Sequence, residues 1–383
     1  MLRDTPRYRL VGTLTRFDER DNVQARNGLA PGSDQYRDYY QAHPEHRKED
    51  DEIRALPGVG RIGQPLDLPL LGKQIESIVR NSTNDVVDGP VAAERQELSP
   101  ERAAEKVKGF AQHLGADLVR VGPLNPAWVY TNVGKPWHDP ARQFGDPIRL
   151  DHDHAISIAS GLDPELIQTG PVLPMIIEVM RAYAELCQIS TTLAAYIRGL
   201  GYPARAHVLA NYQVLCTPVA IDAGMGELGR HGLMITKELG SCLKLATVTT
   251  DLPLVYDPPV DIGVEEFCED CKICAEACPS GAISQGGRQV VRGVEKWCIN
   301  AEACYSVWNE TGTDCGVCLA SCPWTKPRTA FHRLAVEIAS RKRKAGKWMS
   351  WADKLVYGRF SPKPSPHWFE VPPEVWKKYR RLS

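Results

Sequence analysis

The sequence contains no apolar run that approaches the ~20 residues a bilayer-spanning helix requires, and its most hydrophobic stretches, around 172–180 and 69–71, are short and interrupted. It also lacks a surplus of charge, because 46 Lys and Arg face 47 Asp and Glu for a formal net charge of −1. This balance gives no overall field that would attract nucleic acid or an anionic membrane. With 383 residues, the chain is long enough for two or three domains and a buried core, so a disulfide miniprotein is excluded.

Export signals are also missing from the start of the sequence. The first residues contain no basic segment followed by a hydrophobic one, and the single Arg-Arg pair, Arg380–Arg381, lies near the other end. Neither a general secretory signal nor a twin-arginine signal matches this pattern. Unless a leader precedes the given residues, we therefore expect a cytoplasmic protein with no transmembrane segment, whose partners bind at local sites.

Cysteine is concentrated in one segment. Nine of the twelve cysteines fall between Cys268 and Cys322, a crowding that is not typical of a secreted disulfide framework. The first four follow the spacing C-x2-C-x2-C-x3-C, and Pro279 comes directly after the last. This is the bacterial ferredoxin run for a [4Fe–4S] cluster, in which the fourth cysteine ligates a neighbouring cluster. A second set of ligands is therefore expected.

The second set is Cys315, Cys318 and Cys322, followed by Pro323, and its missing ligand must come from upstream. Either Cys304 or Cys298 could supply it. In two-cluster ferredoxins, the last cysteine of each run ligates the other cluster. The same arrangement predicts one cluster on Cys268, Cys271, Cys274 and Cys322, and another on Cys278, Cys304, Cys315 and Cys318. The alternative metal is zinc, but a zinc site does not require the four-cysteine run. The remaining cysteines are expected to be buried packing thiols: Cys187, Cys216, Cys242 and Cys298.

The pattern of apolar residues predicts an α+β core. A helix is indicated over 99–115, with Ser99 as N-cap and Pro100 after it, and a longer one over 174–200. Strand-like runs follow the first helix at 117–121 and the second at 207–209, 219–221 and 246–250. The expected domains are a polar wrapping extension (1–95), the core (96–255), the cysteine module (256–330) and a tail that packs on the core (331–383).

A glycine-rich loop lies in the second half of the core. Residues 224–229 read G-x-G-x-x-G, the spacing of a dinucleotide-binding fingerprint. That reading requires the glycines to open a helix, whereas residues 233–236 look extended. A turn-rich loop is the plainer interpretation. Its glycines permit close approach of the backbone to something large and flat, because no Cβ intervenes.

Several segments together resemble the catalytic subunits of the reductive dehalogenase family, which are related to epoxyqueuosine reductase. They include the ferredoxin run and the later cysteines, with Trp308 and Trp324 nearby. Upstream, in the same order as in the family, stand YIRGLGYPA (196–204), AGMGELGR (223–230) and TDLPL (250–254). The resemblance implies a nitroreductase-like, corrinoid-binding core with an appended ferredoxin-like module of two [4Fe–4S] clusters. It also implies replacement of the halogen of an organohalide by hydrogen.

The resemblance implies roles for particular residues. It places base-off cobalamin near Gly224, Met225, Gly226 and Gly229. The sequence contains no D-x-H-x-x-G motif, whose histidine would ligate the cobalt in the base-off, His-on form. The family pattern of a tyrosine proton donor, a basic partner and a pocket asparagine falls on Tyr183, Lys244 and Asn211. A phenol has an ordinary pKa of ~10, so a nearby cation would make it a competent acid at neutral pH. Rival tyrosines are Tyr196, Tyr202 and Tyr212.

The resemblance also bears on partners. A small organohalide is the expected substrate, and a separate ferredoxin or flavodoxin-type protein is the expected electron donor, because no flavin or further ferredoxin domain is visible. Two other functions compete. An epoxyqueuosine reductase would need a basic face for tRNA, which the net charge does not indicate. A pure electron carrier would leave roughly 250 residues outside the cluster module without a role.

Overall fold

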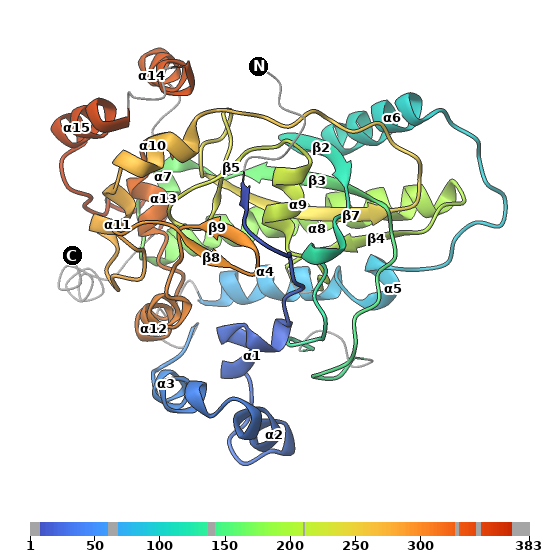
Figure 1. The fold of residues 1–383 in the computed structure, drawn as a ribbon, viewed down its shortest axis with the longest axis horizontal. Helices are drawn as coiled ribbons and strands as arrows, with labels where there is room; N and C mark the ends of the chain where they lie inside the picture. Colours follow the sequence, from blue (N-terminus) through green and yellow to red (C-terminus); the bar gives the residue numbers. More distant parts are fainter. Residues whose placement is uncertain are drawn as a thin grey trace.

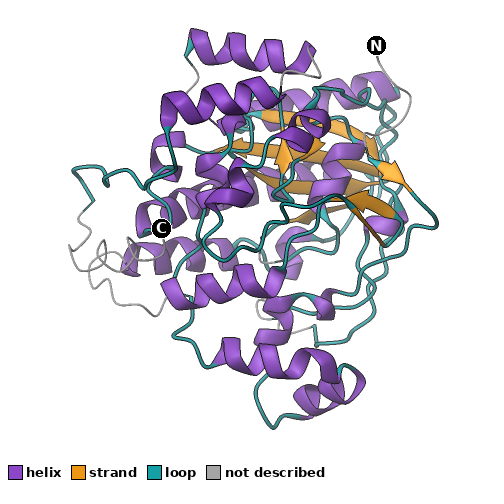
Figure 2. Cartoon of the chain, turned by 60° about the vertical axis from the view of Figure 1, so that its left-hand side comes forward, coloured by secondary structure: helices purple, strands orange, loops and turns teal. Residues whose placement is uncertain are grey.

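The protein is described from a computed structural model, which covers residues 8–59, 68–136, 142–209, 211–325, 329–341 and 346–369. In these residues the centre of the fold is a four-stranded antiparallel sheet with the order β2-β3-β7-β4 (Figure 1). Its strands are β2 (Leu118–Pro123), β3 (His154–Gly161), β7 (Leu243–Thr250) and β4 (Ala204–His207). Figure 2 shows helices on both sides of this sheet. The mixed α+β class predicted from the sequence is confirmed.

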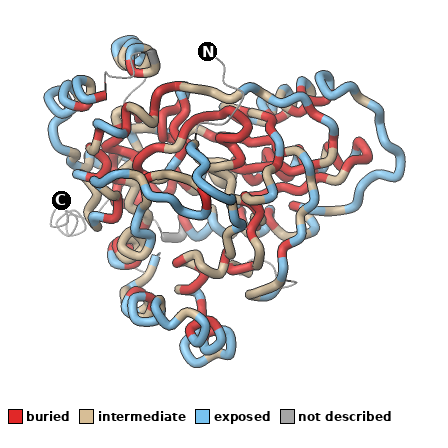
Figure 3. Tube along the Cα trace, viewed as in Figure 1, coloured by how far each residue is buried: buried red, intermediate tan, exposed pale blue. Residues whose placement is uncertain are grey.

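One face of the sheet is covered by the long helix α8 (Leu173–Gly199) and by α6 (Pro100–His113). Helix α6 begins as its sequence predicts, because the Ser99 side chain accepts a hydrogen bond from the Arg102 N–H and Pro100 occupies the first turn. Side chains alternate along β7, so Ala246 and Val248 face this helical layer. The layer forms the largest buried region of the chain (Figure 3).

The opposite face is covered by α9 (Cys216–Asp222), and here one prediction was wrong. Residues 219–221 were expected to form a strand, but they lie within this helix. Val219, Ala220 and Ile221 are all buried, and a short apolar run carries no period that separates a strand from a buried helix. The strand expected at 207–209 is also displaced, since β4 ends at His207 and Val208 pairs with Asn211 in a tight turn.

The glycine-rich loop does not open a helix. Residues 223–240 are all described and contain only two short strands, β5 (Glu227–Leu228) and β6 (Met234–Ile235), which pair with each other. The dinucleotide reading is therefore excluded, as the extended pattern at 233–236 predicted.

The N-terminal residues contain more helix than their polar sequence suggested. The helices are α1 (Val23–Asn27), α2 (Asp34–Ala42), α3 (Pro44–Arg54), α4 (Leu68–Arg80) and α5 (Asn84–Val87). Helix α4 packs along α8, whereas α1 and α3 contact the cysteine module. The buried Arg26 guanidinium bridges Asp50 at 3.0 Å and Glu302 at 2.6 Å. Strand β1 (Arg9–Leu10) joins β9 (Val294–Lys296) and β8 (Gln289–Val291).

The cysteine module is built from short helices: α10 (Val264–Asp270), α11 (Ile273–Ala277), α12 (Ala301–Thr311) and α13 (Val317–Ser321). Two amphipathic helices follow it, α14 (Ala330–Arg341) and α15 (Gly346–Tyr357), and both lie over the module at one edge of the molecule (Figure 1). Residues 370–383 of the predicted tail lie outside the described residues. Among the helices that are described, none combines the length and apolar character needed to cross a membrane.

The remaining short elements connect the core to its surroundings. They are the one-turn helix α7 (Pro164–Ile167) and the 3-10 turns η1 (Glu19–Asp21), η2 (Pro126–Trp128) and η3 (Pro323–Thr325).

Candidate functional site

The structure brings eight of the nine crowded cysteines together in two sets of four. Helix α10 carries Cys268, and the ends of α10, α11 and α13 place Cys271, Cys278 and Cys322 at turns. Helices α11 and α13 pack against each other. None of the twelve cysteines forms a disulfide.

The first set consists of Cys268, Cys271, Cys274 and Cys322, and all four are buried. Burial raises the pKa of the Cys271 thiol to about 12, and the neighbouring Cys322 raises it further. Burial and, second to it, the neighbouring Cys322 also raise the pKa of Cys274, and Cys322 is a neighbour of Cys268 as well. Cys322, which comes 44 residues after Cys278 in the sequence, thus faces the first three cysteines of the ferredoxin run.

The second set consists of Cys278, Cys304, Cys315 and Cys318. Burial raises the pKa of Cys315 to about 12 and that of Cys304 to about 11, and Cys278 is a neighbour of both thiols. Cys318 has all three other members as neighbours. Cys298 stands apart, because the contact described for its thiol is with the Lys296 carbonyl, 3.9 Å away. The geometry therefore favours Cys304 over Cys298 as the upstream member.

Both sets have the chemistry of an iron–sulfur site. Four thiols that are buried together resist ionisation, because their negative charges repel one another in a medium of low dielectric constant. A bound cluster supplies positive iron that offsets this repulsion and takes the thiols as thiolates. The residues present therefore fit two cysteine-ligated clusters.

Arg230 was not singled out from the sequence, yet it holds the first cysteine set to the core. Its guanidinium donates to the carbonyls of Cys268 at 3.0 Å, Ser284 at 2.9 Å and Gly286 at 3.0 Å. The same group stacks 4.7 Å from the Trp297 ring, and its side chain is almost fully buried. Only its place after the glycine-rich loop hinted at a role, because the partners are distant in sequence.

The predicted catalytic pair, Tyr183 and Lys244, is adjacent in space. Tyr183 lies on α8 and Lys244 near the start of β7, and the Lys244 Nζ is 5.2 Å from the centroid of the Tyr183 ring. Burial lowers the pKa of Lys244, but its neighbours Tyr183, Asp314 and Cys318 outweigh burial and raise it. Lys244 therefore carries its charge at neutral pH, next to a phenol and a member of the second cysteine set.

The predicted pocket residue Asn211 lies in a different network. Its Oδ1 accepts from Arg205 at 2.7 Å, and its Nδ2 donates to the Ser82 carbonyl and to Asn84 Oδ1, both at 3.0 Å. These contacts tie the turn after β4 to α5. The hydrogen bonds described for Asn211 use both ends of its amide and do not join it to Tyr183 or Lys244.

The rival tyrosines have other partners. The Tyr196 ring contacts the Phe110 ring at a tilt of 57°, and the Tyr202 hydroxyl donates to the Gln96 carbonyl at 3.1 Å. Tyr212 is partly buried against Lys135, whose Nζ contacts the phenolic oxygen. Burial raises the pKa of Tyr212 well above its usual value and lowers that of Lys135. Tyr212 and Lys135 thus form a second Tyr–Lys pair, held beside Glu19.

The glycines of the predicted cofactor loop approach the chain's own backbone. A Cβ on Gly224 would overlap the Pro258 carbonyl, one on Gly226 would overlap the Ile235 carbonyl, and one on Gly229 would meet the His231 ring at 2.8 Å. Met225 is buried among Met234 and other core residues. Internal packing alone therefore accounts for these glycines, and their contact with a cofactor stays a prediction.

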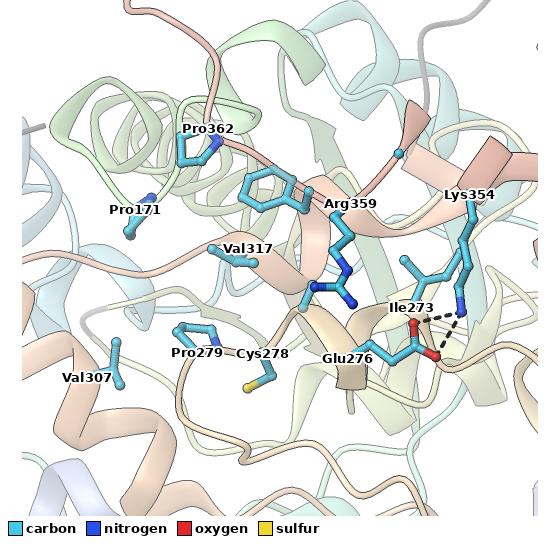
Figure 4. A pocket seen from close by; sticks show the side chains of 13 residues that line it. Pro171, Ile273, Glu276, Cys278, Pro279, Val307, Val317, Lys354, Arg359 and Pro362 are labelled. Carbon is cyan, nitrogen blue, oxygen red and sulfur yellow. Dashed lines mark hydrogen bonds and ion pairs between the residues drawn. The ribbon is translucent and has the colours of Figure 1, made fainter. Parts of the chain in front are cut away.

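A cavity of about 720 Å³ lies beside the second cysteine set (Figure 4). Cys278 and Pro279 form part of its wall, and the segment after α15 closes it with Arg359, Phe360 and Pro362. Most of the other lining residues are apolar, and the ion pair between Lys354 and Glu276 marks one side. This volume is in the range of protein sites for small molecules and cofactors.

Known proteins are similar both to the cysteine module and to the longer part of the chain that contains Tyr183 and Lys244. Residues 267–326 match the 4Fe-4S dicluster domain, which confirms an iron–sulfur module. The tetrachloroethene reductive dehalogenase of Dehalobacter restrictus is 32% identical over 300 residues, or 66% of this chain and 54% of that protein. The corresponding enzyme of Sulfurospirillum multivorans is 34% identical over 283 residues, or 65% of this chain and 56% of that protein. This chain is a homologue of the reductive dehalogenases.

The solved structures agree with this relationship. The catabolic reductive dehalogenase NpRdhA, in complex with 3-bromo-4-hydroxybenzoic acid, superposes with a TM-score of 0.75 at 25% identity over 93% of this chain and 48% of that one. The chain thus spans about half the length of the reductive dehalogenases it matches. An epoxyqueuosine reductase of Aliivibrio fischeri is also similar, at 32% identity, but over only 131 residues and 31% of this chain.

Proposed function

We propose that the protein is a cobalamin-dependent reductive dehalogenase, which replaces the halogen of an organohalide by hydrogen with electrons that pass through two [4Fe–4S] clusters. The observation that carries the proposal is the Tyr183–Lys244 pair beside Cys318. Electrons that pass through clusters held by the two cysteine sets would thus arrive beside Tyr183, the proton donor, and the Lys244 ammonium. Two similarities support the assignment of the cofactor. The chain resembles the reductive dehalogenases in sequence, and it resembles a solved reductive dehalogenase whose dehalogenation is B12-dependent.

The assignment of a corrinoid rests on the homologues rather than on the cavity beside Cys278. The residues that line this cavity include neither Tyr183 nor Lys244 nor the glycine-rich loop. We infer that the cofactor is bound base-off, without a histidine ligand from the protein. When bound, the corrinoid would supply reductive cleavage of the carbon–halogen bond.

The chain's own residues then supply the proton and stabilise the charge that develops. Overall, the organohalide takes up two electrons and one proton, and it leaves as the hydrogen-substituted product and a halide ion. Tyr183 donates the proton to the carbon on which negative charge develops. Lys244 remains an ammonium and stabilises the phenolate that this transfer leaves. The ligand assignments follow the two cysteine sets, with Cys322 in the first and Cys278 in the second.

The test is anaerobic reconstitution with iron, sulfide and cobalamin, followed by measurement of halide release. The panel should include chloroethenes and brominated, chlorinated and fluorinated phenols, because relatives of this chain are named for tetrachloroethene and one was solved with a bromohydroxybenzoate. Release of halide with a matching amount of reduced product supports the proposal. A chain that carries both clusters and corrinoid but releases no halide from any of the compounds would reject it.

Tyr183→Phe tests the proton donor separately. The variant keeps the ring beside Lys244 and removes only the hydroxyl, so both clusters should form as in the wild type. We expect a fall in turnover of roughly 10²- to 10⁴-fold, the usual effect of removing a general acid. Near-normal dehalogenation by this variant would remove Tyr183 from the mechanism, and Tyr196→Phe serves as the matched control.

A further inference from the structure

Helices α14 and α15 bury one face against the first cysteine set. Val336 and Ala339 of α14 and Met349 of α15 pack into the same hydrophobic cluster as Cys268, Cys271 and Cys322. At the start of α15, a Cβ on Gly346 would lie 3.0 Å from the Phe267 carbonyl, one residue before Cys268. The two helices therefore form a cover over this set.

The outer faces of the same helices are apolar and uncovered. On α14 the exposed side chains Phe331, Leu334 and Ile338 recur at helical spacing. Helix α15 repeats the spacing with Trp348, Trp351 and Leu355, of which Trp348 is 75% exposed and Leu355 is 70% exposed. Exposed apolar surface of this extent marks an interaction site in soluble proteins. Tryptophan is also among the residues that most often anchor an interface.

The segment that contains these two helices is basic in sequence, although the chain as a whole is not. Residues 330–363 contain nine Lys and Arg but two Asp and Glu, in a chain with a net charge of −1. Among the described residues, Arg333 and Lys347 are exposed next to the apolar side chains. Lys354 pairs with Glu276 of α11 at 2.7 Å and fixes α15 to the module. The charge complements an acidic partner.

The two cysteine sets differ in what they face. The second set lies beside Lys244, at the end where the proposed chemistry occurs. The first set is buried beneath α14 and α15. An electron that enters the protein through these two helices therefore reaches the first set.

We propose that the outer faces of α14 and α15 are the docking surface for an acidic one-electron carrier protein of the ferredoxin or flavodoxin kind, which reduces the first cluster. This inference rests on the proposed function for the direction of electron flow. Each encounter oxidises the carrier by one electron and reduces the cluster by one, and two encounters supply one dehalogenation. A lipid surface would also suit the apolar stripe, but only a carrier accounts for its position over a redox centre.

The test compares reduction of the reconstituted protein by a protein donor and by a small one. Stopped-flow bleaching of the cluster absorbance is followed after mixing with a reduced acidic [4Fe–4S] ferredoxin, or with dithionite. We expect Lys347→Glu and Trp351→Ser to lower the ferredoxin rate on the order of tenfold, with the dithionite rate unchanged. The wild-type ferredoxin rate should fall as salt is added. The matched controls are Arg102→Glu on α6 and Ile75→Ser on α4, which are exposed elsewhere.

Three outcomes would overturn the proposal. The first is a ferredoxin rate that neither variant changes. The second is binding to vesicles of phosphatidylcholine and phosphatidylserine that both variants abolish while the ferredoxin rate stays the same, which would assign the face to a membrane. The third is a lower melting temperature in both variants with unchanged ferredoxin rates, which would assign the face to the chain's own last residues. Halide release driven by dithionite tests the proposed function independently, because it needs no carrier.

Discussion

Removing the charge of Lys244 should slow dehalogenation without affecting the clusters. Its Nζ lies 5.2 Å from the centroid of the Tyr183 ring. Once the phenol has given up its proton, the negative charge is carried mainly by the oxygen attached to this ring. At that distance and an effective dielectric constant of ~20, the interaction is worth ~3 kcal/mol, or on the order of 100-fold in rate. Lys244→Met should therefore lose about two orders of magnitude in turnover, whereas Lys244→Arg should keep most of it.

The assay is steady-state halide release with a chemical reductant, in preparations matched for iron and corrinoid. The raised pKa of Lys244 keeps the ammonium charged throughout the neutral range, so its loss cannot be rescued by lowering the pH. Lys106→Met on α6 serves as a remote control for the loss of one lysine. Equal turnover in Lys244→Met and the wild type would refute the claim that this cation stabilises the phenolate.

Three further predictions follow from particular contacts. Cys322→Ser should remove a ligand of the first cluster and lower the iron content towards half, whereas Cys298→Ser should leave it unchanged; the reverse result would exclude the crossed assignment. Burial lowers the pKa of His231 to about 4, below the unfolded value of ~6.5. The unfolded chain therefore binds the proton first as the pH falls, and the free energy of unfolding should decline between pH 6.5 and 4 by up to ~1.4 kcal/mol per pH unit. His231→Gln should flatten this slope in urea titrations, and parallel slopes would show that His231 does not contribute. Gly226→Ala should destabilise the fold by ~1–3 kcal/mol because its Cβ would overlap the Ile235 carbonyl, whereas Gly109→Ala on α6, with open space around it, should not; equal melting temperatures for the two variants would contradict this.

Local signals in the sequence predicted much of the core. Ser99 and Pro100 mark the start of α6, and the apolar residues at 176, 179, 180, 183 and 187 recur at the helical spacing that predicted α8. The ferredoxin spacing identified the iron–sulfur module, because three ligands must converge from one short loop. These features depend on residues close together in the sequence, so no knowledge of the tertiary structure was needed.

Features that depend on distant contacts were less accessible. The apolar face of α2 consists of Tyr36, Tyr39 and Tyr40, which made a helical segment look like a polar extension. Arg230 acquires its role only because the first cysteine set folds against it. The assignment of Asn211 came from resemblance, and its hydrogen bonds to Arg205 and α5 could not be seen in the sequence. The proximity of Tyr183 and Lys244 likewise depends on how α8 packs on β7.

The central claim is that one chain holds two clusters and a corrinoid that serve Tyr183 and Lys244. It is tested most directly by measuring the iron and corrinoid that stay bound after anaerobic reconstitution and gel filtration. We predict about eight irons and one corrinoid per chain. Full iron content with no retained corrinoid, under conditions in which a known reductive dehalogenase binds it, would contradict the account.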